Sequence, residues 1–72
     1  MTFDEAQAVL LDPNALTRVD RDAVGEQRFV TLGMGSRRRV LVVVWNQRGE
    51  RIRLISAWKA NQSQRQRYDH QF

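Results

Sequence analysis

The chain has 72 residues, a net charge of +4 and no cysteine, which excludes disulfide bonds and cysteine-ligated metal sites. A chain of this length forms one domain that buries only roughly 60% of its unfolded surface. Its apolar runs are of strand length, far short of the ~20 residues of a membrane helix, and Asp4 and Glu5 stand where a secretory signal needs positive charge. We therefore expect a single domain over residues 1–72, in the cytoplasm and without a membrane segment.

Residues 2–14 predict an N-terminal helix. Thr2 can cap its first turn, and Glu5, three residues later, completes the pattern of a capping box. Apolar residues recur at helical spacing, at Phe3, Ala6, Val9 and Leu10. The helix ends at Asp12-Pro13-Asn14, because proline cannot continue it. Residues 15–19 then predict a short edge strand, and residues 20–26 a polar loop.

Three further strands are predicted in the middle of the chain. Residues 27–33 alternate between two faces, residues 40–45 are apolar on both faces, and residues 51–58 alternate again. A run that is apolar on both faces is typical of a central strand covered on both sides. The connections are short, with one turn around Gly33–Gly35 and another at Gly49, and they favour antiparallel pairing.

The last segment, residues 61–71, predicts a C-terminal helix. Asn61 is a suitable N-cap, and Gln64 follows it at the spacing of a capping box. The predicted fold class is therefore α+β, with an N-terminal helix, a three- or four-stranded antiparallel sheet and a C-terminal helix.

Charge is distributed unevenly along the chain. Residues 1–26 contain six acidic and two basic side chains, whereas residues 27–72 contain ten basic and two acidic ones. A basic segment of this kind favours a phosphate-rich partner such as RNA. We predict an RNA-binding surface formed by Arg37, Arg38, Arg39, Arg65 and Arg67. The alternative is the solvated basic surface of a structural or interaction module.

Few residues offer catalytic chemistry. The only histidine, His70, lies in a terminal segment that is expected to fray, so neither a metal-ligand cluster nor a Ser-His-Asp set can be built. Arginines bind phosphate bidentately and stabilise charge that develops in a transition state. RNA carries its own nucleophile, the 2′-OH, so arginine, lysine and glutamate suffice in principle to cleave it without a metal ion or cofactor. The polar candidates are Glu26, Arg28, Glu50, Arg51, Arg53 and Lys59.

Each candidate also has a structural interpretation. Arg51 and Arg53 share one face of the last predicted strand, which is either a solvated polar face or an RNA-binding one. Glu26 is either a functional acid or a loop acid paired with Arg28. The aromatic residues that we interpret as packing residues, rather than as platforms for base stacking, are Trp45 and Tyr68.

Several segments, in this order and spacing, resemble one family. They are FDEA (3–6), LDP and ALT (11–13 and 15–17), GEQRFVTLG (25–33), LVVVW (41–45), RGERIRLISAWKA (48–60) and QRQRY (64–68). Together they resemble the BrnT family, which are RNA-cleaving toxins of type II toxin–antitoxin systems with a RelE-like fold. The resemblance implies a ribonuclease that stops translation, with a BrnA-type antitoxin as partner, in a homo-oligomer or a toxin–antitoxin hetero-oligomer. It implies phosphate-facing roles for Arg28, Arg51, Arg53 and Lys59, and an acid/base or orienting role for Glu26.

The chain departs from the family pattern in three respects. Trp58 stands where the family usually has arginine, and Gln64 where it usually has glutamate. By regular strand alternation, Trp58 is expected on the core side with Ile52 and Leu54. The family's N-terminal strand and helix are absent before residues 2–14, so we expect an N-terminally incomplete domain with an open sheet edge. These departures predict weak or lost cleavage, and the alternative function is a non-catalytic protein that binds antitoxin or RNA.

Overall fold

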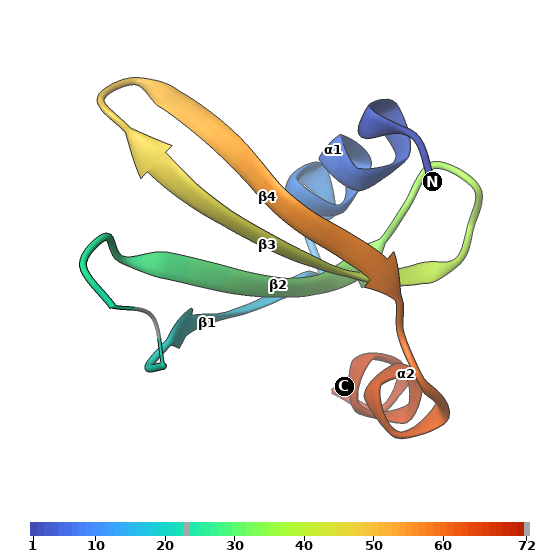
Figure 1. Cartoon of the computed structure of the whole chain (residues 1–72). Coiled ribbons are helices and arrows are strands. Elements are labelled where there is room, and N and C mark those ends of the chain that lie inside the picture. The colour runs from blue at the N-terminus through green and yellow to red at the C-terminus, as the bar shows by residue number, and fades with distance from the viewer. Residues whose placement is uncertain (23, 72) are drawn as a thin grey trace.

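The computed structural model describes residues 1–22 and 24–71. Its elements in chain order are α1 (Phe3–Leu11), β1 (Leu16–Asp20), β2 (Arg28–Met34), β3 (Val40–Arg48), β4 (Arg51–Lys59) and α2 (Gln62–Asp69). The strands form one antiparallel sheet in the order β1-β2-β3-β4, and the helices lie on its two sides (Figure 1). The α+β class and the edge position of the first strand are therefore confirmed. Neither helix of the described part is long and apolar enough to cross a membrane.

The central strand β3 supplies the core on both faces of the sheet. Leu41 and Val43 are fully buried beneath α1, where they pack with residues of that helix. Val40 and Val42 point to the opposite face, where they pack with Tyr68 of α2. The prediction of a central strand covered on both sides is confirmed. We call these two surfaces of the sheet the α1 face and the α2 face.

The two helices are capped differently. At α2, Asn61 and Gln64 form the complete capping box, with hydrogen bonds of 2.8 and 2.9 Å. At α1, Thr2 Oγ1 accepts from the backbone N–H of Glu5 at 3.2 Å, as predicted. The Glu5 carboxylate does not complete that box, because it is buried and accepts two hydrogen bonds from the Arg39 guanidinium. The second half of the predicted α1 capping box is therefore wrong.

Asp12 joins three parts of the fold that are distant in sequence. Asp12 is the C-cap of α1. Its Oδ2 accepts hydrogen bonds from the Met34 backbone N–H at 2.8 Å and from the Tyr68 hydroxyl. Its Oδ1 accepts from the backbone N–H of Asn14. Burial alone would raise the pKa of Asp12, but these hydrogen bonds lower it below its usual value. Burial and the bond to Asp12 raise the pKa of Tyr68 to about 12. Tyr68 is thus a packing residue, as predicted.

The two glycines near the end of β2 allow close packing, and the second one also takes part in the turn predicted there. Gly33 lies within the strand, and a Cβ there would come within 3.0 Å of Val9 Cγ1. A Cβ on Gly35 would come within 2.8 Å of Leu41 Cδ1. The turn begins at Gly35, whose carbonyl accepts from the Arg38 N–H at 3.0 Å, and it includes Arg38, whose φ is 60°. Hydrogen in place of a side chain lets α1 approach the sheet at this point.

A β-bulge in β4 changes which side chains share a face. Val44 pairs with Ser56 and Trp45 with Leu54, so Ile55 is an extra residue between the two pairs. Beyond the bulge the alternation is reversed. Trp58 therefore pairs with Val42 on the α2 face and is 44% exposed. Its expected place on the core side is wrong, because the expectation assumed regular alternation.

Before the bulge, the predicted alternation of β4 holds. Arg51 and Arg53 pair with Arg48 and Asn46, on the α2 face. Leu54, between them and the bulge, packs against the core beneath α1 on the other face. The bulge thus places Trp58 on the same face of the sheet as the two arginines. Helix α2 covers one end of this face (Figure 1), and the two arginines belong to the first residues of β4, beside the β3–β4 turn.

Candidate nucleic-acid interface

The α2 face carries a cavity of about 420 Å³ at the end of the sheet that α2 does not cover. Three of the predicted site residues line it: Glu26 from the loop before β2, Arg28 at the start of β2, and Arg53 in β4. Residues 26, 28 and 53 are therefore brought together by the sheet, because β2 and β4 flank the central strand. The other lining residues are Asp22, Val24, Asn46 and Ile55.

Glu26 is held in place by two neighbours from β3. Arg48 donates from Nε to Oε1 at 2.9 Å and from Nη2 to Oε2 at 3.2 Å, and Asn46 Nδ2 donates to Oε2 at 2.8 Å. The hydrogen bond from Arg48 lowers the pKa of Glu26, and the nearby charge of Arg53 acts in the same direction. Glu26 is therefore ionised at neutral pH. This arrangement suits an orienting carboxylate better than a proton acceptor.

The alternative pairing of Glu26 with Arg28 is wrong. Arg28 Nη2 instead lies 3.5 Å from Asp20 Oδ2, across the β1–β2 pair. Arg53 takes part in none of the ion pairs found among the described residues. Of the two arginines that line the cavity, Arg53 is thus the one whose charge is not compensated by a bonded carboxylate.

The two arginines of β4 have different surroundings. Arg53 lines the cavity and pairs in the sheet with Asn46. Arg51 pairs with Arg48 beside the β3–β4 turn and is not among the lining residues of the cavity. The structure therefore separates two residues that the sequence assigns to one site.

Lys59 lies at the other end of β4, in a second basic cluster. A cavity of about 280 Å³ there is lined by Arg38, Arg39, Lys59 and Arg65, together with Asp69 and apolar residues. Arg39 is engaged by the buried Glu5, whose pKa it lowers. Arg37 is exposed in the adjoining turn. The four cations that line this second cavity therefore lie apart from the cavity that contains Glu26.

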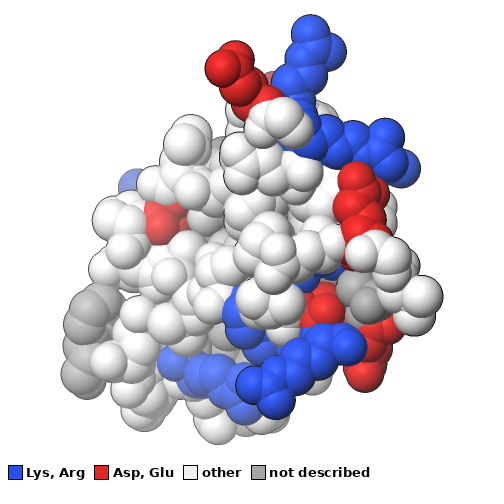
Figure 2. Space-filling model, turned by 90° about the vertical axis from the view of Figure 1, so that its left-hand side faces the viewer, with Lys and Arg blue, Asp and Glu red and all other residues white. Residues whose placement is uncertain are grey.

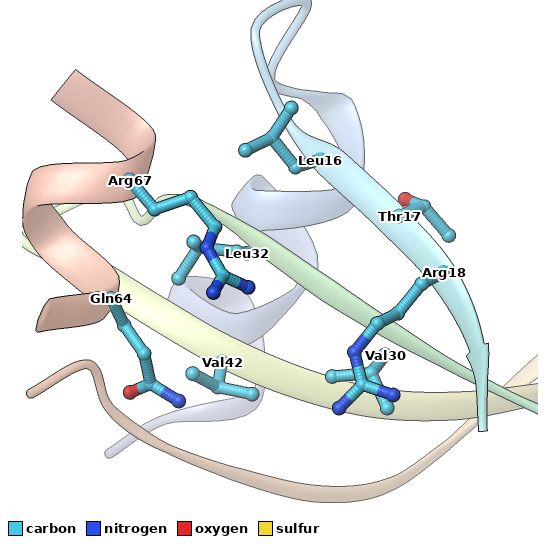
Figure 3. A pocket seen from close by; sticks show the side chains of 8 residues that line it. All are labelled: Leu16, Thr17, Arg18, Val30, Leu32, Val42, Gln64 and Arg67. Atoms are coloured by element: carbon cyan, nitrogen blue, oxygen red, sulfur yellow. The ribbon is translucent and has the colours of Figure 1, made fainter. Parts of the chain in front are cut away.

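A third hollow lies on the α2 face between β1 and α2 (Figure 3). Its volume is about 260 Å³, and its floor is aliphatic. Arg18 from β1 and Arg67 from α2 extend over this floor from opposite sides, and Gln64 lies beside Arg67 (Figure 3). The floor residues are Leu16, Val30, Leu32 and Val42. The sequence predicts an RNA-binding role for Arg67 but does not indicate Arg18.

Basic side chains gather in separate groups on the end of the molecule that Figure 2 shows. Figure 2 shows the end of the molecule where the β1–β2 connection and the β3–β4 turn lie, with blue side chains at the top and across the lower half. Acidic side chains stand beside them at the top and along the right-hand side, and a smaller acidic patch is visible on the left. A polyanion that binds at this end can contact the arginines of the α2 face. The negative charge of Glu26 is compensated there by its ion pair with Arg48.

Sequence reasoning missed Asn46 and Arg48. Asn46 is a polar residue directly after the apolar run 40–45, which is a usable signal in the sequence, and the structure shows that it is 2% exposed. The pairing of Arg48 with Glu26 depends on how the loop before β2 folds, and no local pattern in the sequence predicts it. Trp45 stacks on Phe29 at a centroid distance of 4.6 Å and donates from Nε1 to Thr31, so its packing interpretation is confirmed. Within residues 1–22 and 24–71, no group of three metal-binding side chains occurs.

An α+β domain of this size, with an arginine-lined cavity on the open part of its sheet, is suited to binding a phosphate-bearing chain. Comparison with protein families gives a match of residues 1–64 to the ribonuclease toxin BrnT of type II toxin–antitoxin systems. The match spans most of the chain, and the chain belongs to this family, as the resemblance predicted. Membership implies an antitoxin partner. A search among curated proteins gives no significant match.

Proposed function

We propose that this chain cleaves RNA without a metal ion, at the cavity formed by Glu26, Arg28 and Arg53, and so inhibits translation in the cytoplasm. The observation that carries the proposal is the convergence of two arginines from different strands on one cavity of a family member whose relatives are ribonuclease toxins. Two guanidinium groups donate several N–H bonds in fixed geometry, which suits the oxygens of one phosphodiester.

The proposed reaction uses the 2′-OH of RNA as nucleophile. Its oxygen forms a bond to the adjacent phosphorus while the bond from phosphorus to O5′ breaks, which leaves a 2′,3′-cyclic phosphate and a 5′-hydroxyl. The 2′-OH proton passes to water, and O5′ takes up a proton from water. Arg28 and Arg53 stabilise the extra negative charge on the phosphoryl oxygens in the transition state. Glu26 keeps Arg48 and Asn46 in position.

The test measures cleavage of a 5′-labelled single-stranded RNA in the presence of a chelator. The purified chain is compared with Arg53→Ala and with Arg21→Ala, which removes the same charge from an exposed turn residue outside the cavity lining. Loss of one transition-state donor costs about 10²–10³ in rate, so Arg53→Ala should be nearly inactive while Arg21→Ala retains most activity. Equal activity of the two variants would reject the cavity as the site.

For the antitoxin, we propose that a BrnA-type partner binds over the hollow between β1 and α2 and forms a hetero-oligomer with this chain. The aliphatic floor favours a protein side chain over a nucleobase, because it offers no aromatic ring for stacking. Arg18 and Arg67 are absent from the ion pairs of the described residues and can receive carboxylates at the rim. An acidic segment with an aliphatic anchor fits this chemistry.

The antitoxin surface is tested by co-expression with a BrnA-type antitoxin and purification of the complex. The variant Arg18→Glu/Arg67→Glu should lose the antitoxin, because both rim charges are reversed. The matched control, Arg21→Glu/Arg37→Glu, changes the net charge equally at exposed positions outside the hollow. Retention of the antitoxin by the first variant would exclude this hollow as its binding site.

A second candidate function is binding of antitoxin or RNA without cleavage. Two observations favour it: Arg28 is partly neutralised by Asp20, and a tryptophan occupies position 58, where the family usually has arginine. Under this alternative, the purified chain binds RNA with a salt dependence set by Arg53 but yields no cyclic-phosphate product. Product analysis in the cleavage test above separates the two functions.

A further inference from the structure

Asn46 has a buried oxygen that no group of the protein satisfies. The residue lies in β3, is 2% exposed and lines the cavity with Glu26, Arg28 and Arg53. Its Nδ2 donates to Glu26, whereas Oδ1 has no hydrogen-bond partner, the single such buried side-chain atom found in the described part of the chain. Buried polar atoms are almost always satisfied, so an exception requires a physical explanation.

The orientation of the Asn46 amide is determined by its surroundings. If the amide were flipped, Oδ1 would face the Glu26 carboxylate at the distance where Nδ2 now donates, and two acceptors would oppose each other. Arg48 donates to both oxygens of Glu26, which favours this orientation of the carboxylate. The bonds to Glu26 therefore leave Oδ1 as an acceptor without a partner; because it is buried, a ligand in the adjoining cavity reaches it only by displacing the side chains that cover it.

The neighbours of Asn46 indicate which donor this is. Arg53 pairs with Asn46 across β3 and β4, and Arg28 lines the same cavity. A phosphodiester bound by these arginines brings its own ribose next to Asn46. The hydroxyl nearest to a 3′-phosphate in RNA is the 2′-OH, which DNA lacks. A cavity of about 420 Å³ lies within the size range of small-molecule sites and has apolar walls at Val24 and Ile55.

We infer that Asn46 Oδ1 accepts a hydrogen bond from the 2′-OH of the ribose whose 3′-phosphate is bound by Arg28 and Arg53. Asn46 is then a positioning residue that makes the site select RNA over DNA and holds the nucleophilic oxygen beside the phosphorus. The inference rests on the proposed function, because it requires a nucleotide in this cavity. It adds a residue and a basis for discrimination that the arginines alone do not supply, since they contact only phosphate.

The probes are ribonucleoside 3′-monophosphates and their 2′-deoxy forms. Both carry a 3′-phosphate, and neither has a 5′-oxygen leaving group on it, so they bind without turnover. Titrations followed by amide NMR should show that the unmodified chain binds the ribose form roughly 3- to 10-fold more tightly, as expected for one hydrogen bond. In Asn46→Leu, this preference should fall to about 1, because the acceptor is gone while Arg28 and Arg53 remain. The comparison forms a double-mutant cycle between Oδ1 and the 2′-OH.

A second measurement uses only the unmodified chain, so its result does not depend on whether a variant folds. The 2′-fluoro analogue keeps an electronegative 2′ substituent but cannot donate a hydrogen bond, so the unmodified chain should bind it as weakly as the deoxy form. Equal binding of the fluoro and hydroxyl forms would overturn the inference. So would an Asn46→Leu variant that weakens ribose and deoxyribose forms by the same factor, since Asn46 would then act only through Glu26.

The outcomes also separate this inference from the proposed function. If the nucleotides bind in an Arg53-dependent way without discrimination at the 2′ position, the phosphate site stands and the role of Asn46 is rejected. If no nucleotide binds and Arg53→Ala leaves RNA cleavage unchanged, both the site and the inference are wrong.

Discussion

Trp58 lies opposite Val42 in the pairing of β4 with β3, on the sheet face that carries Arg53 and not on the face that carries Leu54. The extra residue Ile55 causes this placement, because one inserted residue reverses every side chain beyond it. The position that departs from the family pattern is therefore on the proposed RNA-binding face, where its chemistry matters.

We predict that Trp58→Arg raises the rate of RNA cleavage at low RNA concentration by about tenfold, because its cation binds a further phosphate of an RNA that lies along the face carrying Arg53. Trp58→Ala should instead weaken RNA binding by about 1–3 kcal/mol if the ring stacks on a base, and Trp58→Phe should retain most of the affinity. Cleavage assays and filter binding measure both effects. Unchanged cleavage in Trp58→Arg, with full binding in Trp58→Ala, would show that position 58 contacts no RNA.

The arginines of β4 should differ in their contribution to RNA binding. Arg53→Ala should lower the slope of log K against log salt by about 1, as expected for one lost phosphate contact. Arg51→Ala should change the slope by less, because Arg51 lies beside the β3–β4 turn, outside the cavity lining. Fluorescence anisotropy with a labelled RNA at several salt concentrations measures the slopes. A larger effect of Arg51→Ala would move the binding site to the turn.

Glu26 should behave as an orienting group and not as the general base. Its pKa is lowered by Arg48, so its carboxylate remains charged as pH falls toward the ordinary value of 4.5. Cleavage should therefore show no loss attributable to Glu26 between about pH 5.5 and 8. We expect Glu26→Gln to reduce cleavage less than about tenfold, whereas removal of a general base costs about 10²–10⁴. A loss in that larger range would assign proton transfer to Glu26.

The bond between Tyr68 and Asp12 should contribute to stability in a pH-dependent way. Tyr68→Phe should lower the free energy of unfolding by about 1.5–3 kcal/mol, the usual range for a hydrogen bond to a charged group. The pKa of Tyr68 is raised from 10.0 to about 12, so its contribution is present below pH 10 and is lost as pH rises toward 12. Urea unfolding of both proteins across this range measures the difference, which should shrink at high pH.

In acid, the contribution of the Asp12–Tyr68 bond to stability depends on the pKa of Asp12. The pKa of Asp12 is lowered from 3.8, so its contribution is present above pH 3.8 and is lost as pH falls through the lower folded value. Asp12→Asn should therefore have a flatter acid branch of stability than the unmodified chain. An identical acid branch in the two proteins would show that Asp12 is not perturbed by its hydrogen bonds.

Much of the architecture was predictable because it depends on local patterns. The run Val40–Val44 is apolar on both faces, and it became the strand buried between two helices. Asn61 and Gln64 form the predicted capping box because both partners lie within one helical turn. Glu5 has the same spacing from Thr2, yet it pairs with Arg39, because burial of its carboxylate requires a compensating charge that no nearby residue supplies.

By itself, the sequence determined the class of the fold, the central strand, the helix caps that are local, the excess of arginine in the second half and the family. Only the tertiary structure decided which arginines share a cavity, that Glu26 is bound by Arg48 and Asn46, and that Trp58 faces the α2 side. The physical reason is the range of the interactions involved. Periodicity and capping act within a few residues, whereas a bulge and a pair such as Glu26–Arg48 depend on the register of strands brought together by folding.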